Sequence, residues 1–147
     1  MLLKLNQNQY VVNDIINDDP VRPHISAEWR VSNGREVYGL YADESFEDLR
    51  AVICVAYTDK IPETEGDMDS VGTKFAVFYT VWSYDRGAGR DIVFTVAKHV
   101  KDTKTVDRYV TLSPQTEMAR KFHLSNGATE LSVNSETINY EYDPLVI

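Results

Sequence analysis

The sequence predicts a single α+β domain over residues 1–147, with an antiparallel meander of three strands near its middle. Three observations carry this prediction. Strand-like segments follow one another between residues 36 and 84 with no helical pattern between them. Helical spacing of apolar residues recurs after that stretch, over 91–100 and 115–125. Two further strand-like segments, 131–133 and 137–142, then close the chain.

The first third of the chain has a mainly helical pattern. Residues 2–5 fit a short strand, and apolar residues at 11, 12, 15 and 16 have helical spacing. Asp19-Pro20 and Arg22-Pro23 then break the helix. The segment 25–31 fits neither periodicity, but its tryptophan, Trp29, predicts that it packs against another part of the protein.

Three central strands are expected at 36–41, 49–57 and 74–84. The second is rich in β-branched residues and the third in aromatic ones, as strands tend to be. Since polar links and no helix separate them, they are expected to form an antiparallel meander. The link 61–72 is acidic and contains Pro62 and Gly72, which predicts a long flexible connection.

The last third is expected to continue as helix, strand, helix and two strands. The first helix covers 91–100, and a strand follows at 106–112. The second helix covers 115–125, and Asn126-Gly127 ends it, as glycine often does. One face of that helix, predicted to be buried, holds Met118, Ala119 and Phe122.

The net charge of −8, from 15 basic and 23 acidic residues, argues against nonspecific nucleic-acid binding. Basic residues gather at 86–104, which suits a small polyanionic ligand and equally suits a solvated helix face. No apolar run approaches the roughly 20 residues of a membrane helix. The apolar patch at residues 1–5 is too short for a signal-peptide core. We therefore expect a cytoplasmic protein that binds neither nucleic acid nor membrane, and a homodimer is left open.

The number and spacing of cysteine and histidine residues argue against an internal disulfide and against a metal site. Cys54 is the single cysteine, so no internal disulfide can form, and its apolar surroundings at 51–57 predict a buried core residue. The local sequence offers no base or cation that would activate its thiol. His24, His99 and His123 have no metal-ligand spacing with one another or with Cys54, so no metal is expected.

A glycine-containing turn, Asp85-Arg86-Gly87-Ala88-Gly89-Arg90-Asp91, is expected to join the third central strand to a helix. Glycine lets the backbone approach an anion closely, and a helix start presents unpaired N–H groups. Such a junction can bind phosphate, although it can also be a plain turn. It is neither a Walker loop, since no Gly-Lys-Ser/Thr follows, nor a dinucleotide fingerprint, which needs a third glycine.

The turn resembles the acetyl-CoA signature of the GCN5-related N-acetyltransferase (GNAT) family, Gln/Arg-x-x-Gly-x-Gly/Ala. Arg86, Gly87, Ala88 and Gly89 carry this resemblance. Asp91 departs from it, because the family has glycine or alanine there and a carboxylate would repel a pyrophosphate.

The closing helix resembles the family's Asn-x-x-Ala-x-x-Phe/Leu-Tyr-x-x-x-Gly-Phe unit through Ala119, Phe122 and Gly127. His123 stands where the family has a tyrosine that protonates the departing CoA thiolate. A histidine can donate a proton near neutrality, and it can also sit in a last helical turn for the helix dipole alone. The stretch from Thr111 to Pro114, Thr-Leu-Ser-Pro, resembles one in malonyl-CoA decarboxylases, relatives on the same fold, and makes Ser113 a second candidate donor.

The resemblance implies a divergent GNAT member with a mixed, mostly antiparallel twisted sheet flanked by helices. It implies direct transfer of an acetyl group from acetyl-CoA, as co-substrate, to a small-molecule or peptide amine, without a metal. His123 or Ser113 would be the catalytic donor. The implied cofactor-binding residues are Val81, Trp82, Arg86, Gly87, Ala88, Gly89, Arg90, Asp91 and Phe122.

Two points stay open. The alternative function is a GNAT-fold binding or regulatory protein that has lost catalysis, which Asp91 and the missing tyrosine favour. An acceptor amine would also need a general base, which spacing does not identify. Aromatic and acidic residues that could line an acceptor pocket are Tyr38, Tyr41, Glu44, Glu47, Tyr57, Tyr79 and Tyr84.

Overall fold

The computed structural model describes residues 1–5 and 9–147. The described chain divides into two compact units, Met1–Val55 with Thr80–Val96, and Ala56–Tyr79 with Ala97–Ile147. Strands β3 (Leu49–Thr58) and β4 (Phe75–Ser83) and helix α3 (Ala88–Thr103) contribute residues to both units. A single domain over residues 1–147 therefore stays a prediction.

Three antiparallel strands form the sheet of the first unit. Strand β1 (Leu2–Lys4) pairs with β2 (Glu36–Tyr41), and β2 pairs with β3, with Gly39 opposite both Leu3 and Val52. The predicted strands at 2–5 and 36–41 are therefore confirmed. Residues 51–56 of β3 are fully buried, which explains their continuous apolar sequence.

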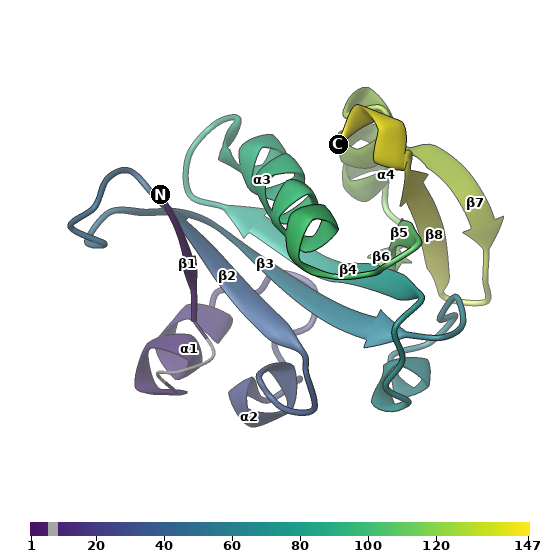
Figure 1. The fold of residues 1–147 in the computed structure, drawn as a ribbon, viewed down its shortest axis with the longest axis horizontal. Helices are drawn as coiled ribbons and strands as arrows, with labels where there is room; N and C mark the ends of the chain where they lie inside the picture. The colour runs from purple at the N-terminus through teal and green to yellow at the C-terminus, as the bar shows by residue number, and fades with distance from the viewer. Residues whose placement is uncertain (6–8) are drawn as a thin grey trace. The chain divides into compact units, whose positions relative to one another are not determined.

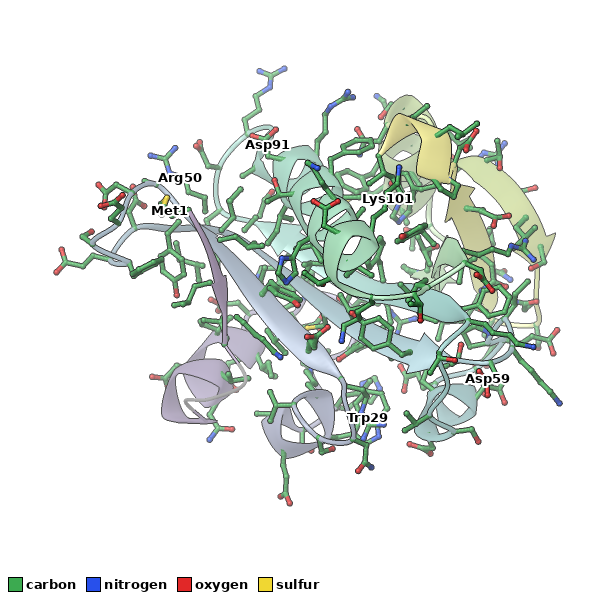
Figure 2. The ribbon with its side chains drawn as sticks, viewed as in Figure 1. Met1, Trp29, Arg50, Asp59, Asp91 and Lys101 are labelled. Carbon is green, nitrogen blue, oxygen red and sulfur yellow. The ribbon has the colours of Figure 1, made fainter. Side chains whose placement is uncertain are left out.

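Two helices of the first unit, α1 (Gln9–Ile16) and α2 (Ala27–Arg30), lie side by side along strands β1 to β3 (Figure 1). The helix predicted from the apolar spacing of residues 11–16 is confirmed, and it begins at Gln9. Helix α2 is capped at Ser26, whose Oγ accepts the N–H of Trp29 at 3.1 Å. Trp29, labelled in Figure 2, packs against the Arg35 guanidinium at 4.0 Å, as its size led us to expect.

Arg30 of α2 forms a buried ion pair with Asp19, in the segment after α1. Arg30 Nη1 is 2.7 Å from Asp19 Oδ2, and neither side chain has exposed surface. Burial alone would raise the pKa of Asp19, but hydrogen bonds from the backbone N–H groups of Arg22 and Val21 and from Arg30 lower it. Arg30 Nη1 also lies 3.6 Å from Cys54 Sγ. The buried position of Cys54 is thus confirmed, and the tertiary fold supplies the cation that its local sequence lacks.

The second unit contains the first residues of β4 and the strands that follow β4 in the chain. The first residues of β4 pair in parallel with β5 (Arg108–Thr111), from Phe75 opposite Arg108 to Phe78 opposite Thr111. Strand β8 (Thr137–Tyr142) pairs antiparallel with β5, with β6 (Ser113–Pro114) and with β7 (Thr129–Val133). The hydrogen-bonded order is β1-β2-β3-β4-β5-β8-β6, with β7 on β8. The predicted mixed, mostly antiparallel sheet with flanking helices is confirmed.

Several predicted boundaries were wrong. Helix α3 begins at Ala88 rather than Asp91, and β5 ends at Thr111 rather than Leu112. Ser113-Pro114, between the predicted strand and helix, is a short strand, because Ser113 pairs with Ile138 of β8. The connection 61–72 contains the short 3-10 helix η1 (Gly66–Asp69), which fully buries Met68.

Helix α4 (Glu117–Ser125) has a different buried face from the one predicted. Met118 is 82% exposed, while His123 is 6% exposed and Phe122 is half-buried. The polar ring of His123 is therefore the centre of the face that packs on the protein. Among the helices of the described chain, none is long and apolar enough to cross a membrane.

Candidate functional site

The glycine turn between β4 and α3 closes through its own backbone. The carbonyl of Asp85 accepts the N–H of Ala88 at 3.2 Å, and the carbonyl of Gly87 accepts the N–H of Asp91 at 3.1 Å. Gly87 has a φ of +83°, in the left-handed region that favours glycine. No heavy atom lies within 4 Å of where a Cβ on Gly87 would stand, so its surface is open. The turn therefore presents exposed backbone directly before a helix.

Residues of the predicted phosphate signature fall into two groups. Ala88 and Gly89 are buried in the first turn of α3, while Arg86 and Arg90 are exposed. The guanidinium of Arg90 lies 5.3 Å from the ring centroid of Phe94. This arrangement leaves basic side chains on the surface and small residues where the helix packs.

Asp91 lies inside the first turn of α3 and points outward into solvent (Figure 2). Its backbone N–H bonds the carbonyl of Gly87, so that N–H is not available to a ligand. A carboxylate in this turn stabilises the helix through the dipole. Asp91 thus has a structural reason to be present that involves no ligand.

Side-chain contacts and a backbone hydrogen bond hold the start of the turn. Arg50 Nη1 is 2.5 Å from Asp85 Oδ2, and the Arg50 carbonyl accepts the N–H of Tyr84 at 2.8 Å. The Tyr84 hydroxyl accepts from Trp82 Nε1 at 3.0 Å and donates to Asp18 at 2.6 Å. Burial and the Asp18 carboxylate raise the pKa of Tyr84 to about 12, so it stays protonated. Trp82 is buried. These contacts fix Asp85, the first residue of the turn, and Tyr84, which precedes it.

In the second unit, Ser113 is buried next to Thr111. Their hydroxyl oxygens are 2.8 Å apart, and Ser113 is 3% exposed while Thr111 is fully buried. Thr111 Oγ1 also accepts the N–H of Tyr140 at 3.0 Å, and its carbonyl accepts Asn139 Nδ2 at 2.8 Å. Thr111 and Ser113 lie two positions apart on consecutive strands, so their side chains share one face.

His123 lies in an aromatic cluster of the same unit. Its Nδ1 is 2.8 Å from the Tyr142 hydroxyl, and its ring stacks on Tyr140 with centroids 5.0 Å apart. The ring of Phe122 meets it edge-on at 5.1 Å. Burial lowers the pKa of His123 to about 4, so the imidazole is neutral at pH 7. His123 can therefore act as a neutral N–H donor or as a base, but not as an imidazolium at that pH.

The main chain of His123 also ends its helix. The carbonyl of His123 accepts the N–H of Ala128 at 3.0 Å, and the carbonyl of Leu124 accepts the N–H of Gly127 at 3.1 Å. With Gly127 at a φ of +92°, this is a Schellman motif. The glycine that matched the family pattern is thus explained by helix termination.

The predicted site residues lie in both units. Those from Val81 to Asp91 belong to the first, and Ser113, Phe122 and His123 belong to the second. Ser113 and His123 take part in separate hydrogen bonds, one to Thr111 and one to Tyr142. Their catalytic and binding roles stay predictions.

Most of the suggested acceptor-pocket residues are core residues. Tyr38, Tyr41, Tyr57 and Tyr79 are 1–7% exposed, whereas Tyr84 is 48% exposed. Glu44 and Glu47 are exposed in the acidic loop. No group of three histidine, cysteine or carboxylate side chains in the described part of the chain could hold a metal ion.

Sequence reasoning missed the residues that hold the candidate side chains. Arg50 and Tyr142 come from segments outside the motifs, and Thr111, although part of the Thr-Leu-Ser-Pro stretch, was given no role. The spacing Thr-x-Ser was an available signal, because extended backbone places both hydroxyls on the same face.

Comparison with known proteins gives structural matches alone. No family model matches the sequence, and no curated protein matches it. A malonyl-CoA decarboxylase from Agrobacterium vitis is similar, with a TM-score of 0.81 and 16% identity over 97% of this chain. The chain spans 60% of the length of that decarboxylase.

Two similar structures match end to end. An acetyltransferase assigned to the GNAT family from Desulfovibrio desulfuricans has a TM-score of 0.68 and 13% identity, with 98% of both chains covered. NAA60 from Arabidopsis thaliana, solved with acetyl-CoA, has a TM-score of 0.67 and 10% identity, with 97% of both chains covered. Identities this low establish the fold alone. The chain has the GNAT fold on a strongly divergent sequence.

Proposed function

We propose that this chain binds an acyl-CoA thioester and transfers its acyl group to an amine. The observation that carries the proposal is the glycine turn before α3, with Gly87 at a φ of +83° and open surface around it, in a chain with the GNAT fold. One structure of the same fold, NAA60, was solved with acetyl-CoA. Acetyl-CoA is the proposed co-substrate, and the acceptor is a small-molecule or peptide amine.

The pyrophosphate would bind at the turn. Backbone N–H groups at the start of α3 and the positive end of its dipole favour an anion there. The exposed guanidinium groups of Arg86 and Arg90 would pair with the phosphate oxygens. Asp91 points outward from the first turn, so it weakens this attraction without occupying the turn.

The pantetheine arm would lie along the end of β4. Val81 is half-buried and Trp82 is buried, and both follow the residues of β4 that pair with β5. Amide groups of an extended ligand can add to a strand in this way. Phe122, half-buried on α4, is proposed to supply apolar contact to the bound cofactor.

In the proposed reaction the acceptor nitrogen attacks the thioester carbonyl carbon. A C–N bond forms, the C–S bond breaks, and the thiolate leaves with the electron pair. The proton lost by the nitrogen ends on sulfur. Ser113 and His123 are the proposed hydrogen-bond donors to that sulfur, His123 through a neutral ring N–H.

Calorimetry with acetyl-CoA tests the proposal. Wild-type protein is expected to bind it, and Arg86→Gln is expected to weaken binding about fivefold by removing a phosphate contact. Lys98→Gln, which removes an exposed cation elsewhere on α3, is the matched control. Pantetheine, which has no pyrophosphate, should bind the wild type and Arg86→Gln equally. Absence of heat with high micromolar acetyl-CoA would contradict the proposal.

A second candidate is decarboxylation of a malonyl thioester. It is favoured by the higher TM-score with malonyl-CoA decarboxylase, 0.81, and by the stretch from Thr111 to Pro114. The bond between the carboxylate and the methylene carbon would break, carbon dioxide would leave, and the methylene carbon would take a proton. Release of carbon dioxide and acetyl-CoA from malonyl-CoA without any amine would select this function over acyl transfer.

A third candidate is a binding protein without catalysis. It shares the proposed acyl-CoA site but lacks turnover, and the aspartate at position 91 and the histidine at 123 favour it. Binding of acetyl-CoA together with no thiol release over a panel of amines, and none from malonyl-CoA, would identify it.

A further inference from the structure

The hydroxyl groups of Thr111 and Ser113 form a pair in which one hydrogen is shared. Their oxygens are 2.8 Å apart, and either could be the donor. The backbone N–H of Tyr140 donates to Thr111 Oγ1 at 3.0 Å. Because an N–H can only donate, one lone pair of Thr111 Oγ1 is already used.

Two arrangements of the hydroxyl hydrogens follow. In the first, Thr111 donates to Ser113, and the Ser113 hydrogen is left to point elsewhere. In the second, Ser113 donates to Thr111, and the Thr111 hydrogen needs another acceptor. Within the described part of the chain, the hydrogen bonds of Thr111 Oγ1 are the two to Ser113 and Tyr140.

Burial decides between the arrangements. Thr111 is fully buried, so a hydrogen left without an acceptor there would be costly. Ser113 is the residue of the pair that keeps some surface, at 3% exposed. The first arrangement therefore satisfies the hydroxyl of the fully buried residue and leaves the Ser113 hydrogen unused by Thr111.

Thr111 is held in a fixed position by strand β8. Asn139 Nδ2 donates to the Thr111 carbonyl and to the Pro62 carbonyl, at 2.8 Å each. The side-chain oxygen Oδ1 of Asn139 accepts from Ser132 Oγ and from Asn134 Nδ2, also at 2.8 Å each. Both the side chain and the main chain of Thr111 are thus tied to β8.

We infer that Thr111 is a positioning residue that donates to Ser113 and so turns the Ser113 O–H away from itself, as a hydrogen-bond donor to a ligand. This inference rests on the proposed function for its chemical role. As the C–S bond of the thioester breaks, the Ser113 hydrogen would bond the sulfur that gains the electron pair. The proton released by the attacking amine then completes the thiol.

Nuclear magnetic resonance tests the direction without any turnover. A hydroxyl proton held in a buried hydrogen bond exchanges slowly with water. We expect the slowly exchanging hydroxyl proton to belong to Thr111 and that of Ser113 to exchange fast. A slow proton on Ser113 would overturn the inference, whether or not the protein transfers an acyl group.

Kinetics test the chemical role, with thiol release from acetyl-CoA over an amine panel as the assay. Thr111→Val, which removes the hydroxyl at constant shape, is expected to lower kcat about tenfold and leave KM unchanged, because the donor loses its orientation. Thr111→Ser keeps the hydroxyl and should stay within about twofold of the wild type. Thr129→Val, on an exposed position of β7, is the matched control.

A double variant of Thr111 and Ser113 distinguishes loss of the Ser113 hydroxyl orientation from general damage to the protein. In a Ser113→Ala background, Thr111→Val should have no further effect on kcat. An equal loss in Thr111→Val and Thr111→Ser, or an additional loss in that background, would overturn the positioning role. Wild-type protein that gives no turnover at all would contradict the proposed function, and the exchange measurement would still decide the hydroxyl direction.

Discussion

Arg30 and Asp19 form an ion pair that is completely removed from solvent, with 2.7 Å between Nη1 and Oδ2. The Thr80 hydroxyl and two backbone N–H groups complete the coordination of the carboxylate. The carbonyl of Arg22 accepts from Arg30 Nη2 at 2.6 Å. This pair joins the segment after α1 to α2 and to β4 inside the first unit.

Removing one partner of this pair should be strongly destabilising. Arg30→Met leaves the Asp19 carboxylate buried without its cation, and we expect a loss of about 3–5 kcal/mol in the free energy of unfolding. The double variant Asp19→Asn/Arg30→Met should recover part of this loss, since no charge remains. Lys98→Gln, which breaks the exposed Lys98–Asp102 pair, should cost under about 0.5 kcal/mol. Denaturant unfolding measures all three, and equal effects of the two single variants would contradict the prediction.

Stability should fall with acidification in a window set by His123. Burial lowers the pKa of His123 from 6.5 to about 4, so between these values the unfolded chain binds a proton that the folded protein does not. The stabilisation is present above pH 6.5 and is lost as the pH falls towards 4, by up to about 3 kcal/mol. Unfolding between pH 7 and 4 measures it. His123→Phe should flatten the dependence, whereas the exposed control His99→Gln should leave it intact, and an unchanged slope in His123→Phe would rule out this origin.

A methyl group at Gly127 should strain the end of α4. Gly127 has a φ of +92° in the Schellman motif, and we expect Gly127→Ala to cost about 1 kcal/mol. Gly66→Ala is the matched control, because a Cβ there meets Thr64 Oγ1 at an ordinary 3.8 Å. Thermal melting compares them, and a control that loses as much stability as Gly127→Ala would refute the conformational explanation.

Asn139 cannot be replaced by its isosteric acid. Its Nδ2 donates to the carbonyls of Pro62 and Thr111, so Asn139→Asp would place an acceptor against both carbonyl oxygens. We expect a loss of about 3 kcal/mol at pH 7. The exposed control Asn13→Asp should change stability by less than about 0.5 kcal/mol. If the two variants melted alike, the donor role of Asn139 would be wrong.

The elements with strong periodicity were predictable from sequence. Strands β2 and β8 have the predicted bounds, because β-branched and aromatic residues mark both segments clearly. The start of α3 was not predictable in the same way. Gly87 and Gly89 both suggest a turn, yet the left-handed φ belongs to Gly87, and Gly89 is already helical.

The errors on α4 and β6 both arise from contacts with β8, which the spacing of apolar residues does not indicate. Apolar spacing placed Met118 in the core, whereas the partners available to His123 on β8 turn the helix so that the histidine is buried. Ser113-Pro114 pairs with β8 although proline lacks an N–H, since the strand is only two residues long. Long-range polar pairs such as Arg30 with Asp19 leave no periodic trace in a sequence.

The two parts of His123 can be separated by experiment. Its carbonyl accepts the hydrogen bond that closes α4, while its ring makes the contacts with Tyr140 and Tyr142. A side-chain substitution therefore removes the imidazole and keeps the main-chain bond that ends the helix. A functional defect in such a variant, at unchanged helix content, would report on the ring alone.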